Sequence, residues 1–188
     1  MTNAPRARWA VLGSACLVLA VTPALAETHS VVIGGLGGDP EFAKRFESWS
    51  AEIAKALPGT LVFNNATAAQ VRSALSSLAQ RSTPQDDVVV MLIGHGTFDG
   101  HVYKFNLRGP DLTAQQLAEL LDAIPSSRQL VVNMTSASGA GLDALRKPDR
   151  IVITATRSGT EKNATIFARY WAEALRNPSA DTDKNESI

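Results

Sequence analysis

The sequence predicts an α/β protein: a three-layer α-β-α sandwich in which a mostly parallel sheet lies between two layers of helices. Short apolar runs typical of strands alternate with longer segments of helical periodicity, which is the pattern of a parallel sheet covered on both sides. Residues 87–93, DVVVMLI, are apolar on both faces, as a central parallel strand requires. The chain of 188 residues is long enough for one domain with a hydrophobic core.

The first predicted strand covers residues 30–33 and runs into a glycine-rich segment at 34–38. Asp39 and Pro40 then supply an N-cap and a first-turn proline for a helix. Apolar residues at steps of three and four give this helix one buried face: Phe42, Phe46, Trp49, Ile53 and Leu57. Residues 60–63 form a second short strand.

Apolar spacing marks a second helix at residues 71–78, and the central strand at 87–93 follows it. Residues 101–107 alternate in polarity and predict a small hairpin or an edge strand. Thr113 and Gln116 have the spacing of a capping box, so the third helix is expected to begin there.

A fourth strand is predicted at residues 129–134 and a fifth at 150–155. The last helix is expected to begin at about Thr160 and to carry a strongly apolar face. We therefore expect one α/β domain over residues 27–178, followed by a polar tail at 179–188.

Residues 1–26 have the pattern of a secretory signal peptide. Two arginines precede an apolar run over residues 9–21, which is shorter than the roughly 20 residues of a membrane span. Ala24 and Ala26 are small residues at the positions that a signal peptidase recognises. We expect cleavage after Ala26 and a secreted or periplasmic mature chain without a membrane span. An uncleaved anchor is the alternative interpretation.

The charge and cysteine content of the predicted mature chain exclude several classes of function. Removal of the leader leaves 16 basic and 18 acidic residues, which gives no indication of binding to nucleic acid or to a membrane surface. Cys16, in the leader, is the only cysteine, so the mature chain has no disulfide and no thiolate nucleophile. His29, His95 and His101 lack a metal-ligand spacing, and we expect neither a metal nor a cofactor.

Ligands bind at the carboxyl ends of the strands in open parallel sheets. Four predicted loops meet at that edge: 34–38, 94–100, 135–139 and 156–160. His95 ends the central strand and Ser136 follows the next one, so a histidine base would face a hydroxyl, the minimum arrangement for nucleophilic acyl transfer. The N–H groups of Gly96 and Ser136 could bind a developing oxyanion. The alternatives are a structural histidine and a serine that only caps the following helix.

The GHG motif at residues 94–96 and the SASG motif at 136–139, each placed after a strand, are similar to motifs of the legumain-type cysteine peptidases. Residues 31–35 resemble the first strand and turn of that family. Residues 152–156, with Ser158, resemble the strand and loop that line its substrate cleft. The order agrees over nearly the whole predicted mature chain, and the resemblance implies the caspase-like form of the three-layer sandwich.

In that family a histidine is the general base and a cysteine is the nucleophile. The resemblance therefore implies that His95 is the base, that Ser136 occupies the nucleophile position and that Gly96 belongs to the oxyanion site. It also implies a substrate-binding cleft that includes the following residues: Gly34, Gly35, Thr135, Thr156 and Ser158. The glycine-rich loop carries no basic residue, so no cleavage preference is predicted.

A serine at the nucleophile position leaves three hypotheses open. Serine needs stronger activation than cysteine, usually from a base held by an oriented acid, and the sequence marks no such acid, although Asp99 is close to His95. The first hypothesis is a proteolytically degenerate domain that binds an extended peptide or a partner protein. The second is an active serine-type hydrolase that uses His95 and Ser136. The third is a structural module of an envelope complex.

Overall fold

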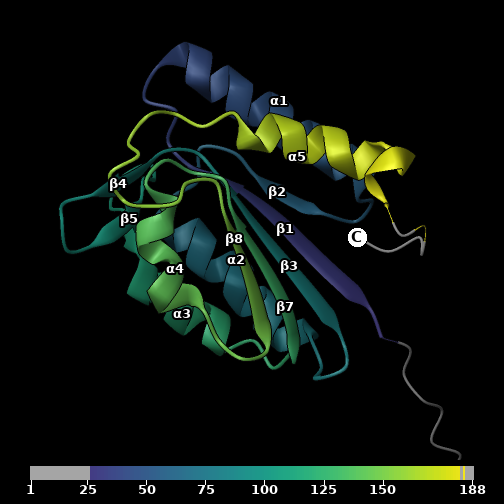
Figure 1. Cartoon of the computed structure of the whole chain (residues 1–188). Coiled ribbons are helices and arrows are strands. Elements are labelled where there is room, and N and C mark those ends of the chain that lie inside the picture. The colour runs from purple at the N-terminus through teal and green to yellow at the C-terminus, as the bar shows by residue number, and fades with distance from the viewer. Residues whose placement is uncertain (1–25, 183, 185–188) are drawn as a thin grey trace, which may run out of the picture.

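Five parallel strands form the central sheet of the computed structural model, which describes residues 26–182 and residue 184 (Figure 1). The strand order is β2-β1-β3-β7-β8, and every neighbouring pair is parallel. The strands have the following bounds: β1 (Thr28–Gly34), β2 (Leu61–Phe63), β3 (Asp87–Ile93), β7 (Arg128–Asn133) and β8 (Arg150–Thr154). The predicted signal peptide lies outside the described residues except for Ala26.

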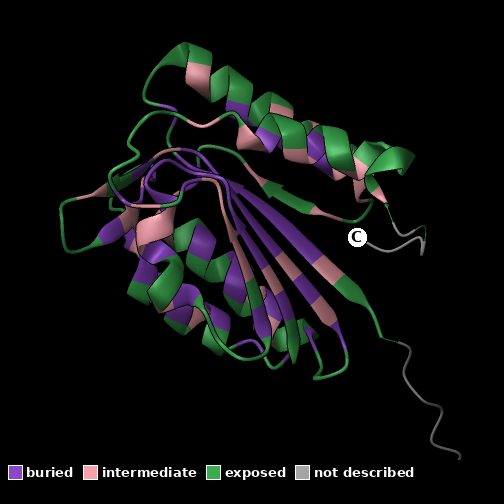
Figure 2. Ribbon diagram, viewed as in Figure 1, coloured by how far each residue is buried: buried purple, intermediate pink, exposed green. Residues whose placement is uncertain are grey.

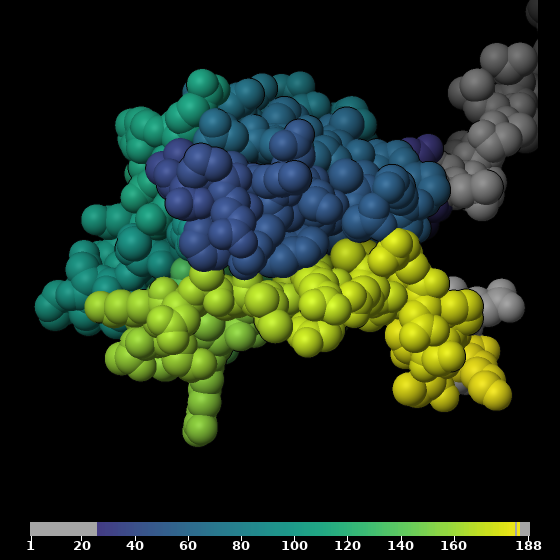
Figure 3. All heavy atoms as spheres, turned by 90° about the horizontal axis from the view of Figure 1, so that it is seen from above, coloured from purple at the N-terminus to yellow at the C-terminus, as the bar shows by residue number. Residues whose placement is uncertain are grey.

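Helices cover both faces of this sheet (Figure 1). One layer consists of α1 (Pro40–Ala56) and α5 (Phe167–Arg176), which lie side by side in Figures 1 and 3. The opposite layer consists of α2 (Ala68–Arg81), α3 (Ala114–Asp122) and the short α4 (Leu142–Leu145). The predicted three-layer α-β-α sandwich with a parallel sheet is confirmed.

Each face of the sheet has its own hydrophobic core, because successive residues of a strand point to opposite faces. Val31, Val90 and Val131 belong to the core beneath α2 and α3. Val32, Met91 and Val132, one residue further along the same three strands, belong to the core beneath α1 and α5. Figure 2 shows that the middle strands are buried over most of their length. This double burial explains why DVVVMLI is apolar at nearly every position.

A second, small sheet lies beyond the carboxyl end of β3. It contains β4 (Gly96–Phe98), β5 (Tyr103–Phe105) and β6 (Leu112–Thr113), all antiparallel. The segment predicted as a hairpin or an edge strand thus supplies the middle strand of a separate sheet. Tyr103 and Phe105 are buried and join the core on the α2–α3 side, so this sheet is attached to the main body.

Two helices, α1 and α3, begin directly after the N-cap residues that the sequence predicted. The Asp39 side chain accepts a hydrogen bond from the Glu41 N–H at 2.7 Å, and Pro40 is the first residue of α1. Thr113 and Gln116 form a capping box at the start of α3, as expected. Thr67 and Gln70 form another capping box before α2, which was not predicted. In the described ranges, every helix is too short or too polar to cross a membrane.

The predicted start of the last helix at about Thr160 was wrong, because α5 begins at Phe167. Residues 155–166 instead form a loop across the carboxyl ends of the strands. The Glu161 carboxylate accepts the N–H groups of Arg157 and Ser158, both at 2.9 Å. Thr165 donates to the Met134 carbonyl at 2.6 Å. These hydrogen bonds stabilise an irregular backbone in place of a first helical turn.

Candidate functional site at the carboxyl edge of the sheet

The two central strands β3 and β7 are neighbours and end together. Leu92 is paired with Asn133, and the Met134 N–H donates to the Leu92 carbonyl at 2.9 Å. The loops that carry His95 and Ser136 therefore leave the sheet side by side. The Gly96 N–H donates to the Ser136 hydroxyl oxygen at 3.2 Å, which ties the two loops together.

Only glycine fits at position 96. A Cβ atom there would lie 2.3 Å from the Ser136 carbonyl oxygen and 2.6 Å from the Tyr103 ring. Real Cβ atoms do not approach backbone oxygens so closely, so the absence of a side chain is what lets the loops touch. This close contact between the loops explains why the residue after His95 is a glycine.

The His95 ring is held by α1 and by the glycine-rich loop. Phe42 and Phe46 contact the ring edge-on, with centroid distances of 4.9 and 5.2 Å. Its Nε2 atom lies 3.1 Å from the Gly37 carbonyl oxygen. A carbonyl can only accept, so Nε2 carries the hydrogen, and in the neutral ring Nδ1 is the atom left with a free lone pair. The surroundings therefore select one tautomer, with Nδ1 as the basic atom.

The Ser136 side chain is almost completely buried, with 1% of the residue exposed. Its hydroxyl oxygen accepts from Gly96, as described above. Within residues 26–182, no hydrogen bond joins this hydroxyl to the His95 ring, and none engages the Ser136 N–H. The base and the alcohol lie at the same edge of the sheet, but each has a backbone group as its partner.

A buried polar cluster supports the Ser136 loop from inside. The Tyr103 hydroxyl lies 2.7 Å from Thr135 Oγ1 and accepts from Asn133 Nδ2 at 3.0 Å. Thr135 also donates to Asn133 Oδ1 at 2.8 Å. Burial raises the pKa of Tyr103 to about 12, so the phenol remains protonated at neutral pH. Thr135, predicted to bind substrate, is fully buried in this cluster.

The other predicted cleft residues fall into two groups. Gly34 and Gly35 are buried at the end of β1; the Gly35 N–H donates to the Ile93 carbonyl at 2.8 Å. Thr156 and Ser158 lie in the 155–166 loop, beside the Ser136 loop. The Thr156 N–H donates to Ser138 Oγ at 3.1 Å. Ser158 is partly exposed, so of these four residues it has the most accessible side chain.

Three residues that contribute to the site were not singled out in the sequence. Gly37 supplies the carbonyl that orients His95. Tyr103 anchors the Ser136 loop. Glu161 holds the 155–166 loop with its carboxylate, and its carbonyl accepts the Ala137 N–H at 2.9 Å. Backbone carbonyls leave no signal in a sequence, but the helix-breaking TRSGTEKN stretch around Glu161 could have indicated a loop.

Residues 64–185 match the family model described as the Peptidase C13 family. This match covers more than half of the 188 residues. The chain belongs to the Peptidase C13 family. Its members include the legumains, as the motifs around His95 and Ser136 had indicated. No curated protein gives a significant match to this chain.

Two solved structures are similar to this C13-family chain. Raptor from Chaetomium thermophilum has a TM-score of 0.53 and 10% sequence identity over 71% of this chain. The similar part is 16% of the Raptor chain. Protein GSU0716 from Geobacter sulfurreducens has a TM-score of 0.46 and 15% identity over 86% of this chain and 67% of its own. The likeness to Raptor supports the caspase-like fold alone.

Proposed function

We propose that this C13-family protein is an exported domain that binds an extended peptide or a partner protein and does not hydrolyse it. The observation that carries the proposal is the separation of the two reactive groups. The Gly96 N–H engages the Ser136 hydroxyl, and the Gly37 carbonyl engages the His95 ring. The proton transfer that would activate the alcohol requires hydrogen-bond reach between the two side chains.

The chemistry of serine supports the same conclusion. A cysteine is already a few per cent thiolate at neutral pH, whereas a serine hydroxyl needs a strong, oriented base. In serine peptidases a buried carboxylate orients the histidine and stabilises the imidazolium that forms. Here the Nε2 partner is the neutral carbonyl of Gly37. A dipole orients the ring but stabilises its positive charge less than a carboxylate does.

The edge of the sheet next to this site supports the binding of an extended chain. Strand β8 pairs with β7 on one side and is the last strand in the sheet order. Ile151 of this strand is 67% exposed. An extended peptide can add to such an edge through main-chain hydrogen bonds. The 155–166 loop continues from β8 toward Ser136, so a peptide on this edge would reach the site.

A serine-type hydrolase is the second candidate, and one observation favours it. The Gly37 carbonyl accepts from His95 Nε2, so in the neutral ring the lone pair is on Nδ1, where a general base could accept a proton. A small rotation of the Ser136 hydroxyl would also release the Gly96 N–H, which could then bind an oxyanion together with the Ser136 N–H.

A fluorophosphonate probe, followed by intact mass, separates the two candidates. We expect no adduct on the wild-type protein and no difference between wild type and Ser136→Ala. In parallel, an array of extended peptides should give ligands whose binding survives Ser136→Ala and is lost when Ile151→Arg alters the β8 edge. An adduct on Ser136 that disappears in His95→Ala would reject the binding-only function. Peptides that bind equally well to the Ile151→Arg variant would reject the proposed surface.

A further inference from the structure

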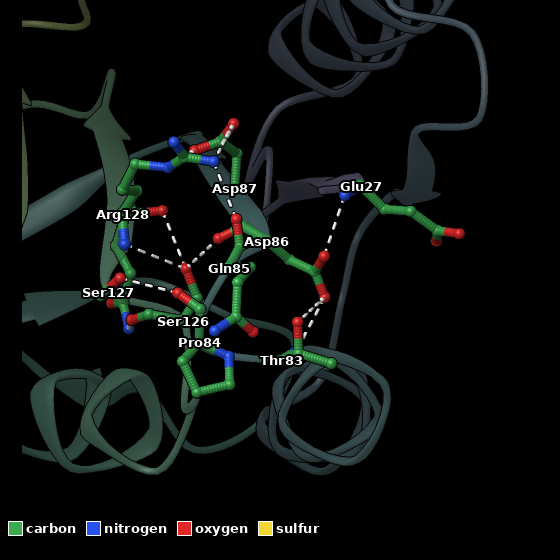
Figure 4. Close-up of polar contacts among 10 residues, drawn as sticks. Glu27, Thr83, Pro84, Gln85, Asp86, Asp87, Ser126, Ser127 and Arg128 are labelled. Carbon is green, nitrogen blue, oxygen red and sulfur yellow. Dashed lines mark hydrogen bonds and ion pairs between the residues drawn. The ribbon is translucent and has the colours of Figure 1, made fainter. Parts of the chain in front are cut away.

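The opposite, amino-terminal edge of the sheet contains a carboxylate that holds the first residue of the predicted mature chain (Figure 4). Asp86 Oδ1 accepts the Glu27 N–H at 2.9 Å. Its other oxygen, Oδ2, accepts the Thr83 N–H at 2.7 Å and the Thr83 hydroxyl at 2.9 Å. The Glu27 carbonyl in turn accepts the Asp87 N–H at 2.8 Å. Glu27 is therefore fixed on both sides, directly before β1.

Asp86 is buried, with 5% of the residue exposed, and it is ionised. Hydrogen bonds from the Glu27 and Thr83 N–H groups are the main reason that its pKa is lowered to about 2. A buried carboxylate normally has a cation as its partner. Arg128, at the same edge of the sheet, is engaged elsewhere: it pairs with Asp87 at 2.6 Å and donates to the Gln85 carbonyl at 2.8 Å.

Within residues 26–182, the only cationic group that faces Asp86 is the His29 ring. Its Nε2 lies 3.6 Å from Asp86 Oδ2, which is beyond hydrogen-bond distance, and it has no hydrogen-bond partner in the described part. An imidazole, unlike the side chains of lysine and arginine, does not carry a permanent positive charge. The site thus holds a buried negative charge without a permanent positive partner, and a backbone nitrogen lies 2.9 Å away.

We propose that cleavage of the leader after Ala26 turns this nitrogen into the missing cation, so that Asp86 binds the new amino terminus of Glu27. Hydrolysis of the Ala26–Glu27 peptide bond consumes one water and leaves a carboxylate on Ala26 and an ammonium group on Glu27. The nitrogen that donates to Asp86 as a neutral amide then donates as a charged amine. Charge-assisted hydrogen bonds are roughly twice as strong as neutral ones.

The position of the cut determines this interaction. A strand advances about 3.3 Å per residue, so a chain that begins one residue earlier has its ammonium group outside hydrogen-bond reach of Asp86. A chain that begins one residue later lacks the nitrogen that Asp86 binds. The site would therefore stabilise the correctly processed protein selectively, because the hydrogen bond from Glu27 to Asp86 would become charge-assisted only after the leader is removed. This inference rests on the predicted cleavage site and is independent of the proposed function.

The test compares exported proteins with shifted amino termini. The full-length chain is exported, and intact mass is expected to show Glu27 as the first residue. A matched chain has one alanine inserted between Ala26 and Glu27, so that its mature form begins one residue earlier, which intact mass checks. We expect the equilibrium constant for unfolding in urea at pH 7 to be about tenfold larger for this chain, because a neutral hydrogen bond from the Glu27 amide replaces the charged one.

Two controls identify the groups involved. Asp86→Asn should abolish the difference between the two termini, and His29→Gln should leave it in place. An ion pair raises the pKa of the amine above its unfolded value of about 8. The stabilisation should therefore be complete from about pH 5, where Asp86 is ionised, to about pH 8, and be lost as the pH rises through the higher folded-state value of the amine. Should Asp86→Asn fail to fold, selective acetylation of the wild-type amino terminus replaces it.

Four results would overturn the proposal. The first is a mature protein that begins at a residue other than Glu27. The second is an inserted alanine that leaves stability unchanged. The third is a difference between the termini that persists in Asp86→Asn or in the acetylated protein. The fourth is a stability difference between the two termini that disappears in His29→Gln, which would identify the His29 imidazole as the positive partner of Asp86.

Discussion

The two edges of the sheet are built from different chemistry. At the carboxyl edge, the candidate site consists of glycines, hydroxyls, a histidine and backbone groups, and its hydrogen bonds are mainly between neutral partners. At the amino edge, Asp86, Asp87 and Arg128 form charged contacts, and the Arg150 side chain is 1% exposed. Charged side chains thus make most of the contacts described where the strands begin, whereas small neutral groups predominate where they end, apart from the Glu161 carboxylate. The comparison indicates that the amino edge contributes ionic contacts that stabilise the fold. At the carboxyl edge, small residues allow the loops to approach one another closely.

The largest effect is expected from restoring a cysteine at the carboxyl edge. Ser136→Cys places a thiol at the nucleophile position, and a thiol needs much less activation than an alcohol. The predicted mature chain of wild type has no cysteine, so we expect a thiol-directed affinity probe for cysteine peptidases to label only the variant. The rate should not change when His95→Ala is added, because within residues 26–182 no hydrogen bond joins position 136 to the His95 ring. Ser138→Cys, two residues away and 0% exposed, is the matched control for a buried thiol. A rate that falls by about a hundredfold without His95, the order of a general-base contribution, would show that His95 acts on position 136.

At the amino edge, the largest effect on stability is expected for Arg150→Ala. Arg150 donates to Gln129 at 2.8 Å, to the Leu145 carbonyl at 2.8 Å and to Asp122 at 2.7 Å. The loss of these three hydrogen bonds should reduce the free energy of unfolding, measured by urea titration, by about 3 kcal/mol. Lys147→Ala is the control, since this exposed lysine also contacts Asp122 but should change stability by less than about 0.5 kcal/mol. Similar losses of stability in the two variants would show that the burial of Arg150 does not strengthen its contacts.

A smaller loss is expected at the carboxyl edge for Gly96→Ala. The new Cβ would force the Gly96 and Ser136 loops apart, and overpacking of this kind costs about 1–3 kcal/mol. Gly141→Ala is the comparison, because its Cβ would meet only the Tyr103 ring, at 3.1 Å. Thermal unfolding should rank Gly96→Ala as the less stable of the two. The reverse order would mean that the loops are not held in contact.

A still smaller effect on stability is expected when acid protonates Asp86 at the amino edge. The folded-state pKa of Asp86, about 2, is below its value of about 3.8 without these hydrogen bonds. A group with a lowered pKa stabilises the fold above the unfolded value and loses this contribution as the pH falls through the folded value. Between pH 5 and pH 2, the melting temperature of wild type should therefore fall more than that of Asp86→Asn. Parallel profiles would exclude Asp86 as the acid-sensitive group.

Most of the fold, but only part of the site, could be predicted from the sequence. The central strands and the first helix have strong apolar periodicity, and the caps at Asp39 and Thr113 mark helix starts, so local physics and tertiary packing agree there. The part of the loop after Thr160 was wrongly assigned to the last helix, because apolar residues at helical spacing begin at Ile166, while Glu161 binds backbone N–H groups.

The hydrogen-bond partners of His95 and Ser136 were harder to predict, for a physical reason. His95 and Ser136 are found by their chemistry and by their position after strands. Their actual partners, the Gly37 carbonyl and the Gly96 N–H, are backbone groups that every residue carries. Only tertiary structure determines which of these groups lies within reach. The buried Tyr103 cluster likewise depends on the small second sheet, whose short strands have little sequence signal.

The central claim is that His95 and Ser136 have separate backbone partners, and nitrogen NMR of histidine-labelled protein tests it most directly. We predict that the His95 Nε2 signal shows a directly bonded proton, that Nδ1 does not, and that Ser136→Ala leaves both signals unchanged. A proton on Nδ1, or an Nδ1 signal that shifts when the Ser136 hydroxyl is removed, would show that the base already engages the alcohol.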